Sequence, residues 1–145
     1  MDELVQWLGE QLDEDERIAQ EASGWLKPAA HWSLDEWFGR ETPHSLIAQG
    51  SPRLPVAGGH FTADPVPTVQ GEHIVRHDPA RVLHEIDAKR RLLELHAPDQ
   101  MEYVDGDVCM VCDVRGEEPF YPCATVRLLA LPYAGRPGYR EEWRP

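Results

Sequence analysis

The chain has 145 residues, 41% of them hydrophobic and 28% charged, which is enough for one domain with a modest core. A formal net charge of −12 argues against direct nucleic-acid binding, because such binding needs cationic side chains against phosphates. No apolar run is long enough to span a bilayer, and the acidic start does not resemble a secretion signal. We therefore expect a cytoplasmic protein with no membrane partner.

A first helix is predicted over residues 2–22. Acidic side chains greatly outnumber basic ones on it, and they form either a solvated face or a docking surface for a basic partner. We expect the solvated face. Apolar side chains that recur at helical spacing define the opposite, buried face: Leu4, Val5, Leu8, Leu12 and Ala19.

Residues 24–70 form a variable region that many prolines and glycines interrupt. Its tryptophans belong either to a core or to a binding surface, and we expect the core. Short apolar pieces between the turns predict strands of a small antiparallel sheet: Trp25–Leu26, Trp32–Phe38, Ser45–Ala48 and Leu54–Ala57.

Residues 71–145 contain the clearest helix signal. After a short helix or turn at 72–77, Asp78 is placed to cap a long helix that Pro79 opens and that ends near Ala97-Pro98.

Two short strands are expected beyond this helix, at 101–104 and 108–111. Residues 122–131 are apolar on nearly all sides and predict a buried helix, after which an aromatic tail is expected to pack back on the domain. The whole chain, 1–145, is thus predicted to form one α+β domain, in which three main helices pack with a small irregular antiparallel sheet.

The sharpest chemical signal is a set of three cysteines with one histidine before them. Cys109 and Cys112 are spaced to grip one ion from a tight turn, Cys123 begins a predicted helix, and His96 ends the preceding one. One imidazole and three thiolates are the ligands of a structural zinc knuckle, so we predict one Zn²⁺ with no open position. The alternative is three buried free thiols. A redox role is less favoured, since no thioredoxin-like strand precedes the pair.

His73 and His77 are a second candidate, because an i,i+4 pair on a helix often binds metal. With His84 or Asp78 they could form the metal site of a hydrolase. No glutamate of an HExxH pattern lies between them, so surface or capping roles are the simpler interpretation.

Three stretches resemble a known family. They are HIVRHDPARVL from His73 to Leu83, CATVRLLALPY from Cys123 to Tyr133, and YREEW from Tyr139 to Trp143; the acidic first helix, from Leu8 to Ala19, is similar too. The chain resembles an uncharacterised family of small actinobacterial and actinobacteriophage proteins, a domain of unknown function. The resemblance implies membership and no mechanism.

Function is not specified by any motif in this chain. The favoured hypothesis is a small non-enzymatic, zinc-stabilised binding or regulatory protein of actinobacteria or their phages. Its expected partner is another protein, and a basic one would match its charge best. The alternatives are the metal-dependent hydrolase that uses His73 and His77, and an acidic nucleic-acid mimic that binds a basic protein.

Overall fold

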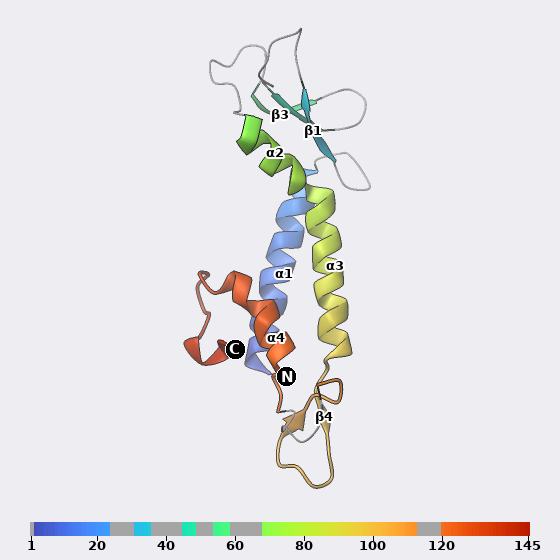
Figure 1. Ribbon diagram of the computed structural model, residues 1–145, viewed down its shortest axis with the longest axis vertical. Helices are drawn as coiled ribbons and strands as arrows, with labels where there is room; N and C mark the ends of the chain where they lie inside the picture. Colours follow the sequence, from blue (N-terminus) through green and yellow to red (C-terminus); the bar gives the residue numbers. More distant parts are fainter. Residues whose placement is uncertain (1, 24–30, 36–44, 49–53, 59–67, 113–119) are drawn as a thin grey trace. The chain divides into compact units, whose positions relative to one another are not determined.

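The computed structural model describes residues 2–23, 31–35, 45–48, 54–58, 68–112 and 120–145. In these parts the chain is mostly helical (Figure 1). The helices are α1 (Glu3–Ala22), α2 (Thr68–Arg76), α3 (Pro79–Leu95) and α4 (Ala124–Ala130), with two short 3₁₀ helices, η1 (Leu131–Tyr133) and η2 (Glu141–Trp143). None of the helices described is both long and apolar enough to cross a membrane.

The strands form two antiparallel sheets. The larger has the order β1-β2-β3, and its register is irregular between Leu46 and Ile47. Its strands are β1 (Trp32–Asp35), β2 (Ser45–Ala48) and β3 (Leu54–Gly58), and the smaller sheet pairs β4 (Asp99–Gln100) with β5 (Asp107–Val108). The predicted α+β class, with its main helices and small antiparallel sheet, is confirmed.

The chain divides into two compact units. One comprises Met1–Glu14 and Ile86–Pro145, and the other comprises Asp15–Glu85. Helices α1 and α3 each contribute residues to both units. The first unit holds the cysteines and the second holds the three-stranded sheet. The prediction of a single domain stays a prediction.

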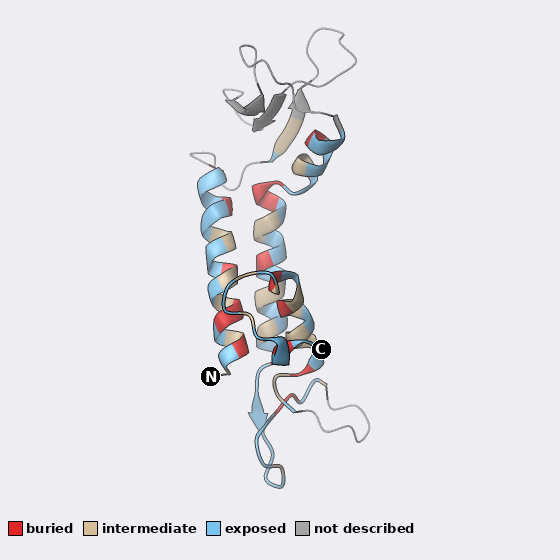
Figure 2. Cartoon of the chain, turned by 90° about the vertical axis from the view of Figure 1, so that its left-hand side faces the viewer, coloured by how far each residue is buried: buried red, intermediate tan, exposed pale blue. Residues whose placement is uncertain are grey.

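Helix α1 buries one stripe of its surface, as its periodicity predicts. Leu4, Leu8 and Leu12 have no exposed surface, and their spacing of four residues places them on one side of the helix. Figure 2 shows the buried positions of the chain in red. The helix begins where the Asp2 carboxylate accepts the amide hydrogen of Leu4 at 2.9 Å, which satisfies one amide of the first turn. It ends where the Ser23 hydroxyl donates to the carbonyl of Ala19 at 2.9 Å.

The C-terminal tail packs on the first half of α1, as predicted from its aromatic residues. Trp7, Tyr139 and Trp143 form a cluster in which each pair of ring centroids is 5.5 to 5.8 Å apart. Such tilted and edge-to-face pairs add to the free energy gained by burial, about 1 kcal/mol each. The indole nitrogen of Trp7 also donates to the carbonyl of Pro137 at 3.0 Å, which fixes the ring.

Gly138 lets the tail approach this close. Its φ of +87° favours glycine, and a β-carbon there would lie 2.8 Å from Nε1 of Trp7. Any larger residue would therefore push against a ring that is held on its other sides, so the glycine is required for the tail to cross Trp7.

In the second unit, Asp78 caps α3 as predicted. Its carboxylate accepts hydrogen bonds from the amide of Arg81 at 2.8 Å, from Nδ1 of His31 at 3.0 Å and from the amide of Trp32 at 3.4 Å. Burial alone would raise the pKa of Asp78, but these hydrogen bonds outweigh it and hold the pKa below the usual 3.8. Asp78 thus ties β1 to the start of α3.

Replacing Asp78 by alanine should cost about 1 kcal/mol of stability at pH 7, the usual effect of losing a helix cap. The folded-state pKa is depressed, so the stabilisation is present above the unfolded pKa and is lost as pH falls through the folded pKa. The difference in unfolding free energy between wild type and Asp78→Ala, measured by urea unfolding, should therefore narrow as the pH falls below about 4. Asp78→Asn is the control, because asparagine also caps but cannot titrate. A gap independent of pH would contradict this assignment.

Three features of the C-terminal part differ from expectation. The predicted strand at 101–104 is wrong: these residues belong to the turn between β4 and β5, which Gly106 closes with a φ of +109°. The strand predicted at 108–111 stops at Val108, because a tight turn begins at the next residue. Helix α4 is also not buried on all sides, since Leu128 is 55% exposed while Val126 and Ala130 are buried.

The variable region was predicted in part. Strands β2 and β3 lie at the expected places, and β1 covers the first half of its predicted span. The expected strand at Trp25–Leu26 and the ring of Trp37 lie outside the described residues. Trp32 is half-buried, and its indole nitrogen has no hydrogen-bond partner among the residues that the structure places.

Candidate metal centre

The four predicted ligands come from three places in the first unit. His96 directly follows α3, and its amide donates to the carbonyl of Leu92 at 3.0 Å, so it completes the last turn of that helix. The side chain is 7% exposed. This position directs the imidazole inward, and a buried imidazole needs a polar partner.

The two-cysteine turn follows β5. Val108 pairs with Asp99 of β4 and forms a bridge to Phe120, so the strand is held on both sides just before Cys109. The amide of Cys112 donates to the carbonyl of Cys109 at 3.1 Å, which closes a tight turn and brings the two side chains to one side.

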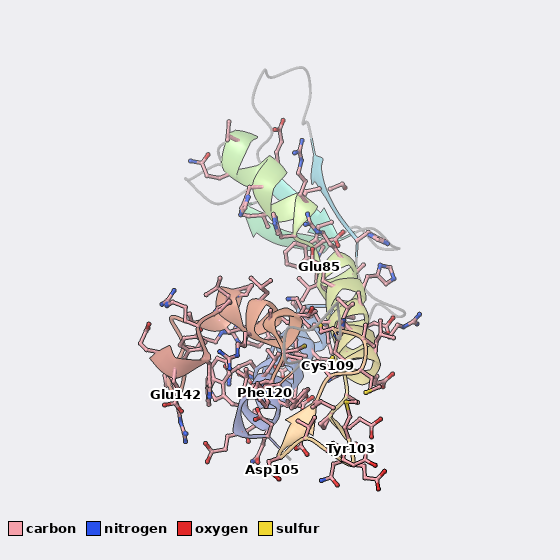
Figure 3. All side chains as sticks on the ribbon, turned by 60° about the horizontal axis from the view of Figure 1, so that its bottom comes forward. Glu85, Tyr103, Asp105, Cys109, Phe120 and Glu142 are labelled. Atoms are coloured by element: carbon pink, nitrogen blue, oxygen red, sulfur yellow. The ribbon has the colours of Figure 1, made fainter. Side chains whose placement is uncertain are left out.

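The third cysteine lies at the start of α4. Cys123 is the N-cap residue, and its carbonyl accepts the amide hydrogen of Arg127 at 3.1 Å. The preceding peptide bond, Tyr121–Pro122, is cis. Figure 3 labels Cys109 near the helices, with Tyr103 and Asp105 farther out along the β4–β5 loop.

These elements bring four donor atoms together. Nδ1 of His96 lies 3.3 Å from Sγ of Cys109, 3.4 Å from Sγ of Cys112 and 3.7 Å from Sγ of Cys123. All four atoms lie within 4.8 Å of one another. One imidazole nitrogen carries at most one hydrogen, so the three contacts cannot all be hydrogen bonds.

The distances fit a tetrahedral ion. With bonds of about 2.3 Å to sulfur and about 2.05 Å to nitrogen, an ideal tetrahedron has nitrogen–sulfur edges of about 3.6 Å. The three observed edges lie on both sides of that value. Cys109 and Cys123 are buried, and Cys112 is half-buried. The residues present therefore fit a metal in kind, number and spacing.

The electrostatics of the thiols also call for a cation. Burial raises the pKa of Cys123 to about 11, so this thiol stays protonated at neutral pH unless a positive charge offsets the burial. Burial would also raise the pKa of Cys112. Hydrogen bonds outweigh it and lower this pKa, and the one from Thr125 contributes more than those from the other two thiols. A bound cation would displace the protons and remove the cost of placing thiolates here.

Thr125 was not among the predicted site residues. Its hydroxyl lies 3.7 Å from Sγ of Cys112, where it can donate a weak hydrogen bond to the thiolate and hold it in place. The signal that could have indicated it is its position two residues after Cys123, in the first turn of a helix that begins at a ligand.

His73 and His77 are arranged differently. Their ring centroids are 4.4 Å apart, and both side chains are exposed. Nδ1 of His77 lies 2.8 Å from the carbonyl oxygen of His73, which can only accept, so this nitrogen carries the hydrogen and donates it. The contact caps the end of α2. In the described part of the chain, three or more His, Cys, Asp or Glu donors come close enough to share an ion at His96 and its three cysteines. His73 and His77 do not belong to that group.

The fold and this site define a small, mostly helical protein with a largely buried Cys₃His cluster suited to a metal ion. A family model matches residues 1–145, and the chain belongs to that family, DUF6221, a family of unknown function. The resemblance to a domain of unknown function is thereby confirmed. No curated protein and no solved structure matches the chain.

Proposed function

We propose that this chain is a small binding or regulatory protein whose fold is held by one structural zinc ion. The observation that carries the proposal is the Cys₃His cluster, whose four donor atoms lie within 4.8 Å of one another. Around one ion they would complete a tetrahedron and leave no position for a substrate. When bound, zinc cross-links the end of α3, the two-cysteine turn and the start of α4. The chain's own residues supply the donors and their orientation, and none of them needs to take part in a reaction.

The described residues between these anchor points are mostly exposed. We call residues 99–123 the knuckle segment; its described strands are two residues long, and its turns are largely exposed. Strands this short are not stable by themselves. A zinc ion would therefore supply much of the free energy that orders the segment, as it does in other small zinc-dependent folds.

The knuckle segment presents apolar side chains to solvent, which supports binding rather than catalysis. Of the ten large hydrophobic residues exposed in the described part of the chain, five lie in this segment, and Tyr103 is 90% exposed. Aromatic residues and methionines are enriched where proteins meet. The five are Met101, Tyr103, Met110, Val111 and Phe120.

The partner best matched to this surface is a protein with basic side chains around an apolar contact. Four exposed acidic residues accompany the apolar ones: Asp99, Glu102, Asp105 and Asp107. The described residues of the knuckle segment include no lysine or arginine. Complementary charge speeds encounter and selects against acidic competitors. The resemblance noted for the sequence would place this partner in actinobacteria or their phages.

The two other hypotheses have less support. The hydrolase would need both imidazoles on one ion, yet His77 uses one ring nitrogen to cap α2; it does line a hollow of about 320 Å³, but its neighbours there are mostly apolar. The acidic mimic would present the carboxylates of α1 to a basic protein. Several of these carboxylates instead contact side chains of the same helix, such as Glu21, which pairs with Arg17 at 2.7 Å, as expected of a solvated face.

The binding function can be tested by affinity capture from an actinobacterial lysate, with the zinc-loaded chain as bait. We expect Tyr103→Ser to lower the amount of captured partner at least about tenfold, since exposed aromatics at interface centres often contribute more than about 1.4 kcal/mol. Leu128→Ser is the matched control, because Leu128 is exposed on α4, outside the knuckle segment. The zinc content of both variants should equal that of the wild type. Equal capture by both variants would contradict the assignment of this surface.

A further inference from the structure

A small hollow in the first unit combines aromatic walls with carboxylates. It measures about 230 Å³, and Trp7 and Trp143 line it together with Glu3, Glu10 and Arg140. Both carboxylates are exposed, whereas both indoles are more than nine-tenths buried. Aromatic rings beside carboxylates are suited to a cationic group that carries some apolar surface of its own.

The chain already places one such cation here. The guanidinium carbon of Arg140 lies 5.3 Å from the ring centroid of Trp143, and Nη1 of Arg140 forms an ion pair with Glu3. Arg140 also lies 3.6 Å from a carboxylate oxygen of Glu142. A guanidinium is therefore compatible with this wall of the hollow, and one side of the hollow is occupied from within the chain.

The other carboxylate has no such partner. Glu10 accepts a hydrogen bond from the side-chain amide of Gln6 at 3.3 Å, and no ion pair to it is found among the described residues. It lies on α1 two turns after Glu3, so the two carboxylates share one face of the helix. A second cation near Glu10 could therefore bind without displacing the ion pair between Arg140 and Glu3.

The aromatic wall is held rigidly. The Trp7 indole is fixed by the carbonyl of Pro137 at 3.0 Å, by Gly138 at close approach and by the rings of Tyr139 and Trp143. A site whose walls do not move loses little conformational entropy on binding.

We propose that this hollow binds an arginine side chain of a partner protein. The guanidinium contacts the indole wall and pairs with Glu10, and Arg140 opposes it as a neighbouring like charge. The inference rests on the proposed binding function but not on the zinc ion. It assigns a defined contact to the basic partner that the net charge of −12 favours.

The test is a titration of the zinc-loaded chain with the peptide acetyl-Gly-Arg-Gly-amide, followed by NMR of the indole N–H signals. Those of Trp7 and Trp143 should shift, because these rings line the hollow. The lysine peptide should bind more weakly, since a hydrated ammonium stacks less well than a planar guanidinium. The citrulline peptide, which has the same shape without the charge, should produce no shift.

Three variants separate this site from general attraction to an acidic protein. Glu10→Gln should weaken binding about threefold and Arg140→Gln should strengthen it about threefold, the range expected for exposed charges. Glu94→Gln removes an exposed carboxylate of α3 that does not line the hollow and should change nothing.

Several results would overturn the proposal. Equal weakening by Glu10→Gln and Glu94→Gln would show general electrostatic attraction. Weaker peptide binding in Arg140→Gln would contradict the role of Arg140 as an opposing like charge, and indole shifts on adding inorganic phosphate would make Arg140 an anion ligand instead. Shifts that depend on protein concentration without peptide would identify a second copy of the chain as the occupant. If peptide binding follows the proposal while lysate capture fails, the arginine site stands and only the knuckle-segment surface is refuted.

Discussion

Replacing His96 by alanine is expected to lower the affinity for zinc at least about 100-fold, or about 2.7 kcal/mol. The imidazole nitrogen lies 3.3 to 3.7 Å from all three sulfurs, so its loss opens the tetrahedron on the side facing α3. The variant should also unfold at lower temperature, because zinc binding and folding are coupled. Competition with a chromophoric zinc chelator measures the affinity directly.

The matched control is His84→Ala. His84 lies on the same helix, is exposed and is not in the cluster, so its replacement removes a histidine without removing a ligand. Affinity in this variant should equal that of the wild type. If His96→Ala also keeps wild-type affinity, the fourth donor comes from elsewhere and the assignment of His96 is wrong.

Replacing Leu8 by alanine is expected to destabilise the chain by about 2–5 kcal/mol, the range for deleting a fully buried leucine side chain. Leu8 has no exposed surface and lies between Leu4 and Leu12 on the buried stripe of α1. Alanine keeps the helix, since its helix propensity is higher, so the loss reports packing and the cavity alone. The midpoint of urea unfolding should fall accordingly.

Leu128→Ala is the control for that measurement. The same atoms are removed from a side chain that is 55% exposed, so the change should be well under about 1 kcal/mol. A Leu8→Ala variant no less stable than Leu128→Ala would show that this stripe is not part of the core.

The main helices were predictable because their signals are local. The stripe of α1 repeats at helical spacing, and Asp78-Pro79 marks the start of α3 by residue type alone. The tail's aromatic residues indicated that it packs back. Its contact with Trp7 was not predictable, because the two segments are about 130 residues apart and a close approach at Gly138 decides it.

The cysteine cluster was predictable in its members and not in its surroundings. Chain spacing already limits Cys109 and Cys112 to one turn. Two more donors lie at the ends of helices, His96 just after α3 and Cys123 just before α4. Residues 101–104, in the segment between β4 and β5, were misread as a strand because three of the four are large apolar residues. Met101 and Tyr103 are exposed instead, since the ladder from Asp99 to Val108 leaves 101–106 as its turn.

The bound ion is the basis of the proposed function, and metal analysis of the purified chain is its decisive test. The protein should be purified under reducing conditions without chelators and measured by elemental analysis against its own sulfur content. The Cys₃His cluster predicts one zinc per chain. A content well below one zinc, in protein that remains folded and whose three thiols react freely with a thiol reagent, would show that these cysteines are buried free thiols and would contradict the proposal.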